Sequence, residues 1–546
     1  MQTSGKFRHN RANSTSDSVP MTEQQPDVLS LTVPQLLRRR AGESPSLLAL
    51  SARSVHGWRD RLTYAQLVER MDVMAAGLVA EGMVPDDRIA IFLGNDAGRE
   101  CILTSLGALR LGASVSPLNV RYADEELQHA LVLVEPAAVV CTAADAARIR
   151  RLFPPAMLLI VDGDGAGMEQ ARRWPDPAAS LALPMPPDPQ DPMRLACLLF
   201  TSGTTARSKA VMHNHRTMIG AGLSCSTALG LQRGDLYQGG WPFFTSSGLN
   251  LGCMSSWVAG GGLVFEEPLS NAGRLELIGK EKSTFYHGVP SVIHFMIDEF
   301  SRGTYDVSSL RRIGYGGSAM PLEVVERIDR RWPHVEQVQI YGMTESGPSG
   351  TVLEPSMMRK KAGSIGVAMP YCGLEILDEQ GQELPRGETG EIFLTGPGVA
   401  TGYFRNPQAT AEAFIRGGIR TGDIGHLDPD GYLFFTDRRK DVINRGGLKI
   451  ASIAVEEVLY RHPAIREAAV FAIPHKDLGE DVAAAVAPAP GATLDFDEIA
   501  AFCRDKLADY ARPRRFIVLD ELPKNPMGKI LKAELRERFR KNESGV

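Results

Sequence analysis

The stretch at residues 198–215, LLFTSGTTARSKAVMHNH, decides how the rest of the chain is interpreted. Five hydroxyl side chains, one glycine and two cations fall within residues 201–209, directly after the apolar run LACLLF. A strand that ends in such a turn presents backbone N–H groups, hydroxyls and a lysine to phosphate oxygens. The common G-x-x-x-x-G-K-[ST] loop is absent, and runs of Ser, Thr and Gly are also typical of plain surface hairpins. Taken alone, the stretch leaves a phosphate loop and a surface hairpin open.

Composition narrows the class of protein around this stretch. With 546 residues the chain is too long for one ordinary core, so we expect several domains. A net charge of −5 offers no overall positive field, and we expect no nucleic-acid partner. The seven cysteines are scattered without a C-x-x-C pair, which is typical of reduced thiols and predicts a cytoplasmic protein. No run reaches the roughly 18 apolar residues that a membrane span needs.

The texture of the sequence divides it into three parts. Residues 1–30 begin polar and rich in Ser and Asn, and we predict a disordered N-terminal extension. Residues 31–436 alternate amphipathic helices with short apolar runs and then change to short strands with turns such as DPDG. This pattern predicts a large N-terminal domain of layered α/β subdomains plus a β-rich subdomain. A new pattern over residues 437–546 predicts a small α+β C-terminal domain of about 110 residues.

Further motifs follow the opening stretch in order: YGGSAMP at 315–321, YGMTE at 341–345, RTGDIG at 420–425, DRRKDVINRGG at 437–447 and LPKNPMGKI at 522–530. With TSGTT-x-x-x-K they resemble the signature of the adenylate-forming superfamily, which contains acyl-CoA synthetases, firefly-type luciferases and peptide-synthetase adenylation domains. The chain is most similar to fatty-acid or aryl/alicyclic-acid CoA ligases. The resemblance implies an adenylation domain at residues 31–436 and a mobile C-terminal domain at residues 437–546.

The resemblance also implies which residues bind ATP. The pyrophosphate side would be gripped by Thr201, Ser202, Gly203, Thr204, Thr205 and Lys209. Gly316, Gly317 and Ser318 would lie against the adenine, where glycine permits close approach. The remaining nucleotide contacts would be Tyr341 stacked on adenine, Gly342 beside it, Asp423 on the ribose hydroxyls, and Arg438 at the domain junction.

Three residues are expected to be catalytic. A carboxylate that attacks the α-phosphate brings two anions together, so cations must offset their repulsion. By resemblance, Lys529 bridges these anions, Thr344 donates to the α-phosphate, and Glu345 is the Mg²⁺ ligand.

The second half-reaction is expected to use the domain junction. Lys440 falls at the family's hinge, about which the C-terminal domain rotates between adenylation and thioesterification. After rotation, Gly446 and Gly447 would form the narrow passage for the thiol of CoA.

The acyl pocket is expected along residues 241–248, 287–289, 315–317 and 342–343. Its members include Thr245, His287, Gly288, Tyr315 and Met343. Most of these segments are small or apolar, which favours a hydrophobic acyl group and offers no countercharge for a second carboxylate. His287 is the exception.

Several positions depart from the family's pattern. Ala206, Ser208 and Ala210 stand where Gly, Pro and Gly are usual, and Thr245 replaces a frequent histidine or aromatic ring. Ser452 occupies a position that is commonly Pro. None of these changes affects Lys529, Glu345, Asp423 or Arg438, so we expect an active enzyme. His213 and His215 have no third metal ligand at fitting spacing and are interpreted as structural.

We therefore expect an AMP-forming acid–thiol ligase. A small carboxylic acid and MgATP would give acyl-AMP and pyrophosphate, and CoA would then displace AMP. ATP, Mg²⁺ and CoA are the expected cofactors and co-substrates, and the protein is expected to be a monomer or homodimer. Two alternatives stay open: an enzyme that loads a carrier protein or an amine, and a non-catalytic ATP- or acyl-binding relative. The sequence does not decide which acid is used.

Overall fold

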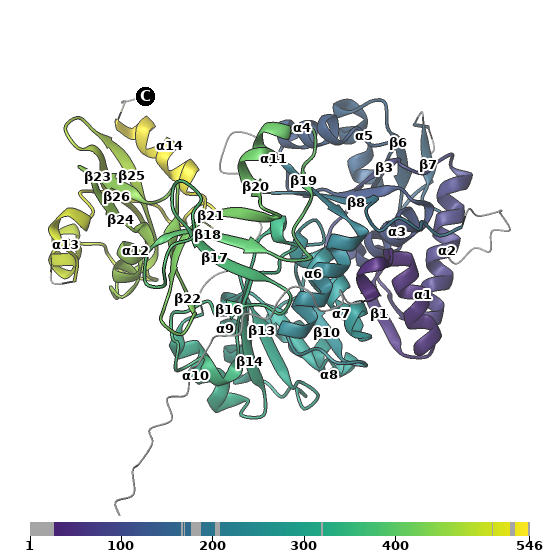
Figure 1. Cartoon of the computed structure of the whole chain (residues 1–546), viewed down its shortest axis with the longest axis horizontal. Helices are drawn as coiled ribbons and strands as arrows, with labels where there is room; N and C mark the ends of the chain where they lie inside the picture. Colours follow the sequence, from purple (N-terminus) through teal and green to yellow (C-terminus); the bar gives the residue numbers. More distant parts are fainter. Residues whose placement is uncertain are drawn as a thin grey trace, which may run out of the picture.

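The computed structural model describes residues 27–164, 167–168, 170–175, 187–201, 208–317, 320–504, 506–524 and 530–543. A large body carries a smaller C-terminal lobe, which lies at the left of Figure 1. Residues 1–26 of the predicted N-terminal extension lie outside the described residues. Its last four residues form a 3-10 helix, η1 (Asp27–Ser30), whose Leu29 is buried. The described chain therefore begins four residues before the predicted domain start at residue 31.

The first large sheet carries the ends of the hydroxyl-rich stretch at residues 198–215. Its order in the described chain is β19-β9-β8-β4-β3-β5-β6-β7. The bounds are β3 (Arg88–Phe92), β4 (Ser114–Pro117), β5 (Ala138–Cys141), β6 (Met157–Ile160), β7 (Ala171–Arg173), β8 (Leu195–Phe200), β9 (Ala210–Asn214) and β19 (Gly402–Tyr403). The central strands are parallel, whereas β8 and β9 form an antiparallel hairpin. Residues 201–209 connect these two strands.

Helices cover both faces of this sheet, because successive strand side chains point to opposite faces. Ile89 and Ile91 pack with α2 and α3, while Ala90 and Phe92 pack with α4 and α5. The helices of this part are α1 (Val33–Glu43), α2 (Tyr64–Ala80), α3 (Gly98–Leu111), α4 (Asp124–Val134) and α5 (Ala143–Leu152), with η2 (Asn95–Ala97) before α3. Capping side chains set some boundaries: Thr63 accepts from Gln66 N at the start of α2.

The second large sheet has the order β16-β15-β14-β13-β12-β10-β11-β1-β2 in the described chain. Its strands are β1 (Leu48–Arg53), β2 (Arg59–Thr63), β10 (Leu236–Gly239), β11 (Gly262–Phe265), β12 (Phe285–Gly288), β13 (Arg312–Tyr315), β14 (Glu336–Tyr341), β15 (Thr351–Leu353) and β16 (Val367–Ala368). One face packs on α8 (Asn271–Glu281), α9 (Pro290–Phe300) and α10 (Leu322–Arg331). The opposite face belongs to the same core as α6 (His215–Ala228), the π-helix η3 (Ser247–Met254) and α7 (Ser255–Ala259).

Two smaller sheets complete the chain. The first contains β17 (Gly373–Leu377), β18 (Gly390–Thr395), β20 (Phe414–Ile415), β21 (Gly418–Leu427) and β22 (Leu433–Arg438). The second forms the C-terminal lobe with β23 (Ile443–Arg445), β24 (Leu448–Ile450), β25 (Ile465–His475), β26 (Gly479–Pro488) and β27 (Arg515–Val518). The remaining elements are η4 (Thr344–Ser346), η5 (Pro355–Met357), α11 (Pro407–Ala413), α12 (Ser452–Tyr460), α13 (Phe496–Arg504), η6 (Asp509–Ala511) and α14 (Lys532–Glu543).

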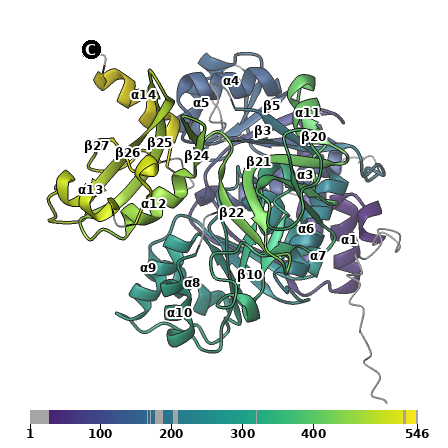
Figure 2. The ribbon, with the colours of Figure 1, turned by 60° about the vertical axis from the view of Figure 1, so that its left-hand side comes forward.

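The chain changes sheet between Arg438, where β22 ends, and Ile443, where β23 begins. The predicted hinge residue, Lys440, lies between these two strands. The lobe contains its own apolar core, built from α12, α13 and the inner faces of β25 and β26. Figure 2 shows this lobe standing beside the body, with α14 next to β25. The fold class is the predicted α/β body with a smaller C-terminal domain.

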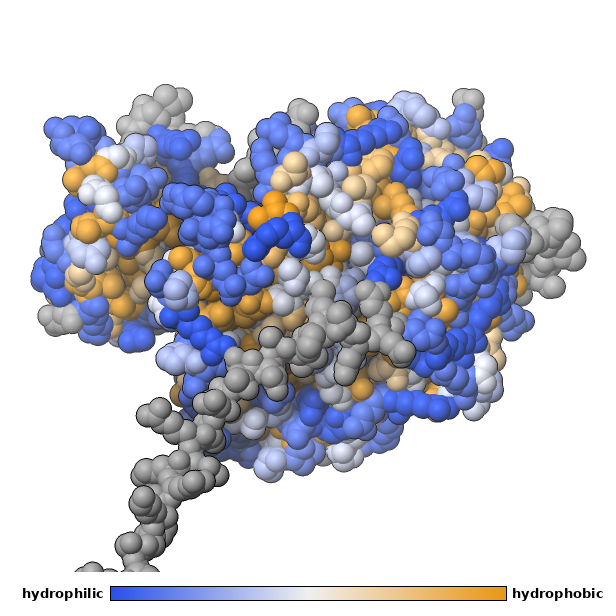
Figure 3. All heavy atoms as spheres, in the orientation of Figure 1, coloured by the Kyte–Doolittle hydropathy of each residue, from blue (hydrophilic) through white to orange (hydrophobic). Residues whose placement is uncertain are grey.

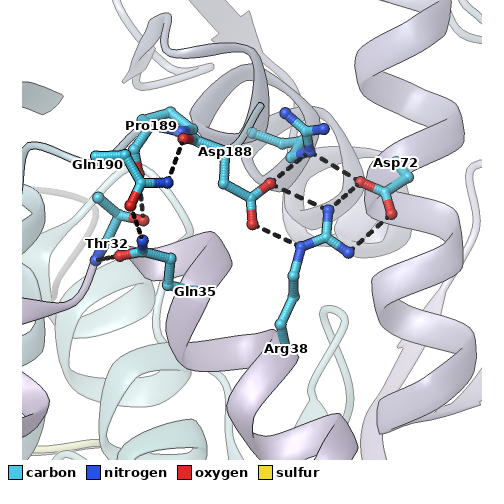
Figure 4. A network of polar contacts seen from close by, with 8 residues as sticks. Thr32, Gln35, Arg38, Asp72, Asp188, Pro189 and Gln190 are labelled. Carbon is cyan, nitrogen blue, oxygen red and sulfur yellow. Dashed lines mark hydrogen bonds and ion pairs between the residues drawn. The ribbon is translucent and has the colours of Figure 1, made fainter. Parts of the chain in front are cut away.

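The sequence at residues 174–192 is rich in proline, a composition typical of an exposed connection, and the end of this stretch is tied to the N-terminal helices. Arg38 on α1 pairs with Asp72 on α2 and with Asp188, at 2.6 Å in each case. Arg110 on α3 contacts the same two carboxylates. Figure 4 shows Arg38 pointing toward Asp72 and Asp188. The carboxylate of Asp188 is only 11% exposed. Thus residues 187–192, which by composition read as an exposed linker, are fixed onto the body where they lead into β8.

No helix in the described part of the chain combines the length and apolarity that crossing a membrane requires. On the face drawn in Figure 3, hydrophilic residues predominate, and hydrophobic residues occur in separate small groups.

Candidate active site

A cavity of about 1780 Å³ lies where the body meets the C-terminal lobe. Its walls come from the ends of strands in both large sheets, from β21 and β22, and from the lobe. The predicted site residues that line it are Thr201, Thr245, Lys209, His287, Gly316, Gly317, Gly342, Met343, Thr344, Glu345, Arg438 and Lys440. Motifs that are far apart in the sequence therefore face one space.

The two ends of the hydroxyl-rich segment at residues 201–209 lie at this cavity. Thr201 N donates to Lys209 O at 3.1 Å, which closes the β8–β9 hairpin. Ser208 O lies 3.1 Å from Nε2 of His129 on α4. The Lys209 ammonium sits 4.6 Å from the ring centroid of Tyr403 and faces the cavity. Ser202, Gly203, Thr204, Thr205 and Ala206 lie outside the described residues, as does Ser318.

The YGMTE turn places a buried carboxylate on the cavity wall. Glu345 is 6% exposed, and its Oε1 accepts from the Tyr403 hydroxyl at 2.9 Å. Burial raises the pKa of Glu345, while the Tyr403 hydrogen bond and the nearby Lys209 charge lower it. Gly342 is required here, because a Cβ would lie 1.8 Å from Pro348 O. The turn thus holds an ionisable carboxylate within reach of the Lys209 and Arg438 charges.

The backbone of this turn is anchored from β9. Nε2 of the buried His213 lies 2.9 Å from Thr344 O, and its Nδ1 lies 3.2 Å from the Thr217 hydroxyl. Asn214 ends β9 and caps α6 by accepting from Thr217 N. Burial lowers the pKa of His213 to about 4, so the ring is neutral near pH 7. His213 is structural, as interpreted from the sequence, but it positions Thr344 directly.

The side chains that are expected to contact adenine and ribose are bonded to one another. The Tyr341 hydroxyl donates to Asp423 Oδ2 at 2.7 Å, and Arg438 Nε lies 3.3 Å from Asp423 Oδ1. Strand pairing explains the second contact, since Asp423 and Arg438 are register partners on β21 and β22. Tyr341 and Asp423 are not among the residues that line the cavity, although Gly342 and Arg438 beside them are.

The lobe closes the cavity with the segments that flank Lys529. Lys529 itself lies outside the described residues. Lys524 and Ile530 pair across that segment as an isolated bridge, and Lys524 and Leu531 line the cavity. Burial lowers the pKa of the lining residue Lys440 to about 8.

Gly446 and Gly447 occupy the β23–β24 turn with φ of +58° and +90°, in the left-handed region that favours glycine. Neither is among the residues that line the cavity in this arrangement.

A bonded chain of side chains crosses the domain junction. Asp437 on β22 accepts from Ser452 N at 2.5 Å, at the start of α12. Lys532, at the start of α14, donates to the Ser452 hydroxyl at 2.6 Å and pairs with Glu456 at 2.7 Å. Ser452 therefore connects the last strand of the body with the helix that follows the Lys529 segment.

Two of the five residues named individually for the acyl pocket are not among the residues that line the cavity. Tyr315 is fully buried with α8–α10, because Gly314 and Gly316 flank it and alternate strand residues face opposite ways. Gly288 is also absent from the lining. Thr245 lines the cavity, but its hydroxyl donates to Pro242 O at 2.7 Å and accepts from Gly248 N at 3.2 Å, so it is used locally.

Sequence reasoning did not identify two side chains that contact the predicted site. Tyr403 lies on the two-residue strand β19, where nothing in the TGYF context marks a functional ring. Tyr237 on β10 lies behind His287 and reads as an ordinary core tyrosine. Both depend on pairing between segments that are distant in the chain, which a single sequence does not display.

Glu345 fits the role of a Mg²⁺ ligand. One of its oxygens is bonded to Tyr403, and the carboxylate lines the cavity beside Thr344 and Lys209. No group of three or more His, Cys, Asp and Glu side chains suited to a metal gathers within the described residues. One carboxylate is sufficient for Mg²⁺, which usually completes its shell with water and substrate phosphates.

The comparisons with known proteins agree with this geometry. The family model of the AMP-binding enzymes matches residues 37–404, and that of the AMP-binding enzyme C-terminal domain matches residues 454–529. A feruloyl-CoA synthase of Amycolatopsis is 33% identical, over 92% of this chain and 98% of its own. An indoleacetate–CoA ligase of Aromatoleum aromaticum is 32% identical, over 87% of this chain and 93% of its own.

A solved structure shares the fold and binds the expected ligands. It is the o-succinylbenzoate CoA synthetase of Bacillus subtilis in complex with ATP and magnesium ion. The TM-score is 0.80 at 27% identity, covering 92% of this chain and 99% of that chain.

The chain belongs to the family of AMP-binding, adenylate-forming enzymes. Within it, the enzyme is an ATP-dependent, AMP-forming acid–CoA ligase that uses ATP, Mg²⁺ and CoA, as predicted from the sequence.

Proposed function

We propose that this ligase activates an aryl or alicyclic acid whose acyl body carries no second charge. The observation that carries the proposal is the wall of the cavity around Trp241, Phe244, Leu251, His287 and Met343. Within the described lining of this side there is no Lys, Arg, Asp or Glu, whereas charged residues gather on the nucleotide side. A mostly apolar, aromatic wall favours a hydrophobic ligand.

His287 does not change this conclusion. Burial lowers the pKa of its imidazole to about 3, so the ring is neutral at physiological pH. A neutral ring cannot serve as countercharge for a second carboxylate. The feruloyl-CoA synthase and the indoleacetate–CoA ligase carry aromatic acids in their names, which supports the same substrate class for this chain.

For adenylation, we propose the residue roles that the family resemblance implies. Lys529 offsets the repulsion as the acid carboxylate attacks the α-phosphate and pyrophosphate leaves. Thr344 and Lys209 hold phosphate oxygens, and a Mg²⁺ ion bound by Glu345 supplies further neutralisation of phosphate charge. The lining positions of these last three residues and of Lys524 and Leu531 support an adenylation arrangement of the lobe.

For the second step, we propose that Lys440 is the hinge and that Gly446 and Gly447 move to the acyl-adenylate. The thiolate of CoA then attacks the acyl carbonyl, and AMP leaves. Asp423 and Arg438 hold the ribose, while Gly316, Gly317 and Tyr341 lie against the adenine. These assignments also predict that CoA, rather than a carrier protein or an amine, accelerates AMP release.

The proposal is tested by mixing enzyme, MgATP and CoA with aliphatic, aryl, alicyclic and dicarboxylic acids. We expect AMP and pyrophosphate release with aryl or alicyclic acids and little with dicarboxylic acids. Release only with dicarboxylic or short aliphatic acids would overturn the substrate class. Formation of ADP with every acid would overturn adenylation itself.

The Lys529→Ala variant tests the catalytic assignment. Loss of a cation aimed at the reacting charges should slow adenylation by about 10²- to 10³-fold. CoA transfer from supplied acyl-AMP should change far less, because that step does not require Lys529. Lys524→Ala is the matched control, since Lys524 pairs with Glu467 and Glu521 and should tolerate removal. Equal effects of the two variants would contradict the role of Lys529.

We also propose a cytoplasmic location and a monomer or homodimer. All seven cysteines are free thiols, and six are buried, which supports a reducing compartment. Cell fractionation tests the location, and light scattering tests the oligomeric state.

A further inference from the structure

A buried cluster of polar and aromatic side chains lies at the acyl wall, and its hydrogen bonding is incomplete. His287 on β12 is fully buried, with the Tyr237 hydroxyl 2.7 Å from its Nδ1. Its Nε2 has no hydrogen-bond partner, although His287 is one of the residues that line the cavity. Trp241 packs edge-on against the same ring, with centroids 5.3 Å apart.

Strand register explains why a histidine fits here. His287 lies opposite Gly239 on β10 and Gly314 on β13, so both neighbouring strands lack a side chain at this level. A Cβ at Gly314 would lie 3.3 Å from Cδ2 of His287. Tyr237 lies two residues before Gly239, on the same face of the sheet, and so reaches Nδ1. The two glycines leave room for the imidazole, and the contacts with Tyr237 and Trp241 fix its position.

The hydrogen bonds decide which nitrogen carries the proton. Burial raises the pKa of Tyr237 well above its ordinary value, so the hydroxyl keeps its hydrogen. Among the described residues, His287 Nδ1 is the acceptor available to that hydrogen. Trp241 can only donate, and its indole N–H lies beside the same hydroxyl without a hydrogen bond of normal geometry. Since Tyr237 donates to Nδ1, the neutral imidazole carries its own hydrogen on Nε2.

A buried N–H without a partner is unfavourable, and a substrate oxygen that accepts from it removes this penalty. We propose that the acid activated here bears an uncharged oxygen acceptor on its acyl body, a hydroxyl, ether or carbonyl group, which accepts from His287 Nε2–H. This inference rests on the proposed aryl or alicyclic substrate class and narrows it. Tyr237 is a positioning residue that fixes the tautomer of His287.

The test uses phenylpropanoic acids in matched pairs. Each pair carries a hydroxyl or a methyl group at the ortho, meta or para ring position, so size is preserved while the oxygen is exchanged. Adenylation is followed as acid-dependent pyrophosphate release. A purely apolar wall would favour methyl at every position. We expect one hydroxyl acid to exceed its methyl partner in kcat/KM by about tenfold or more.

His287→Phe should remove this preference and favour the methyl acid. Tyr237→Phe keeps the imidazole but no longer fixes the hydrogen on Nε2. The preference for the hydroxyl acid should therefore become smaller without reversing. It also carries the test if His287→Phe does not fold. His56→Phe is the matched control: His56 is an exposed histidine stacked on Trp58, and its replacement should leave the preference unchanged.

The outcomes separate this inference from the substrate class on which it rests. A wild-type enzyme that prefers methyl at every position, or a hydroxyl preference that survives His287→Phe, would overturn the role of His287 alone. Failure of every aromatic acid to release pyrophosphate would instead overturn the proposed substrate class.

Discussion

Two buried corners of the cavity, one around Glu345 and one around His287, are built from similar residues but differ in how completely they are bonded. At the Glu345 corner, both nitrogens of His213 have partners, and Tyr403 bonds the carboxylate. At the His287 corner, Nδ1 is bonded to Tyr237 and Nε2 is left without a partner. Every member of this family must bind ATP, whereas the acid differs between its members. With the roles proposed above, the completed corner would face ATP, the constant reactant, and the incomplete corner would face the acid, the variable one.

The largest effect is expected from Glu345→Gln, which keeps the Tyr403 hydrogen bond but removes the charge. If this corner holds Mg²⁺, the adenylation rate should fall by about 10²- to 10³-fold. The thermal unfolding midpoint should hold or rise, because a buried charge is removed. Glu388→Gln on the exposed surface is the control. A loss below about tenfold would mean that the corner serves structure rather than phosphate chemistry.

An acid titration compares the two histidines directly. Burial lowers the pKa of His213 to about 4 and that of His287 to about 3. In the unfolded chain these histidines have an ordinary pKa near 6.5, so the unfolded state takes up protons first as the pH falls. The free energy of unfolding should therefore be greatest above about pH 6.5 and should fall below it. For His213 the loss between pH 6.5 and 4 should reach about 3 kcal/mol.

The measurement is the thermal unfolding midpoint as a function of pH. His213→Gln, which retains a donor for Thr344 O, and His287→Phe should each flatten the acid limb, and the double variant should flatten it further. An unchanged limb in both single variants would show that neither ring is neutral in the folded enzyme.

Tyr403→Phe should have the smallest effect. Its ring would still lie beneath Lys209, but Glu345 would lose a donor worth about 1 kcal/mol, so adenylation should slow several-fold. In the wild-type enzyme this hydrogen bond lowers the pKa of Glu345, so its loss should raise that pKa. The acid limb of the activity profile should therefore move to higher pH. Tyr432→Phe is a close control, since Lys361 lies 4.8 Å from the centroid of that ring, outside the cavity lining. An unchanged pH profile would show that Tyr403 does not influence the ionisation of Glu345.

Much of this arrangement could be predicted from the sequence, because ordered motifs carry information about the whole family fold. The α/β body, the C-terminal domain and the shared cavity around Lys209, Thr344 and Glu345 follow from those motifs. The direction of single side chains could not be predicted in the same way. Tyr315 belongs to a motif that borders the cavity, yet strand alternation turns its ring into the helix-covered core.

Contacts between distant segments were also beyond sequence reasoning. Tyr403 reaches Glu345 because β19 pairs with β9, and Tyr237 reaches His287 because β10 pairs with β12. Both depend on strand order and register, which local patterns do not specify. The roles of Lys529 and of residues 202–205 stay predictions, because these positions lie outside the described residues.

Ser452 gives the junction between body and lobe a property that a proline at this position would remove. Its backbone N–H is bonded to Asp437, and proline has no such hydrogen to donate. If the lobe rotates about Lys440 as proposed, the Asp437–Ser452 bond would have to break, whereas Ser452 and Lys532 would move together within the lobe. Ser452 thus gives the junction one hydrogen bond that would oppose rotation of the lobe and that a proline at this position would lack.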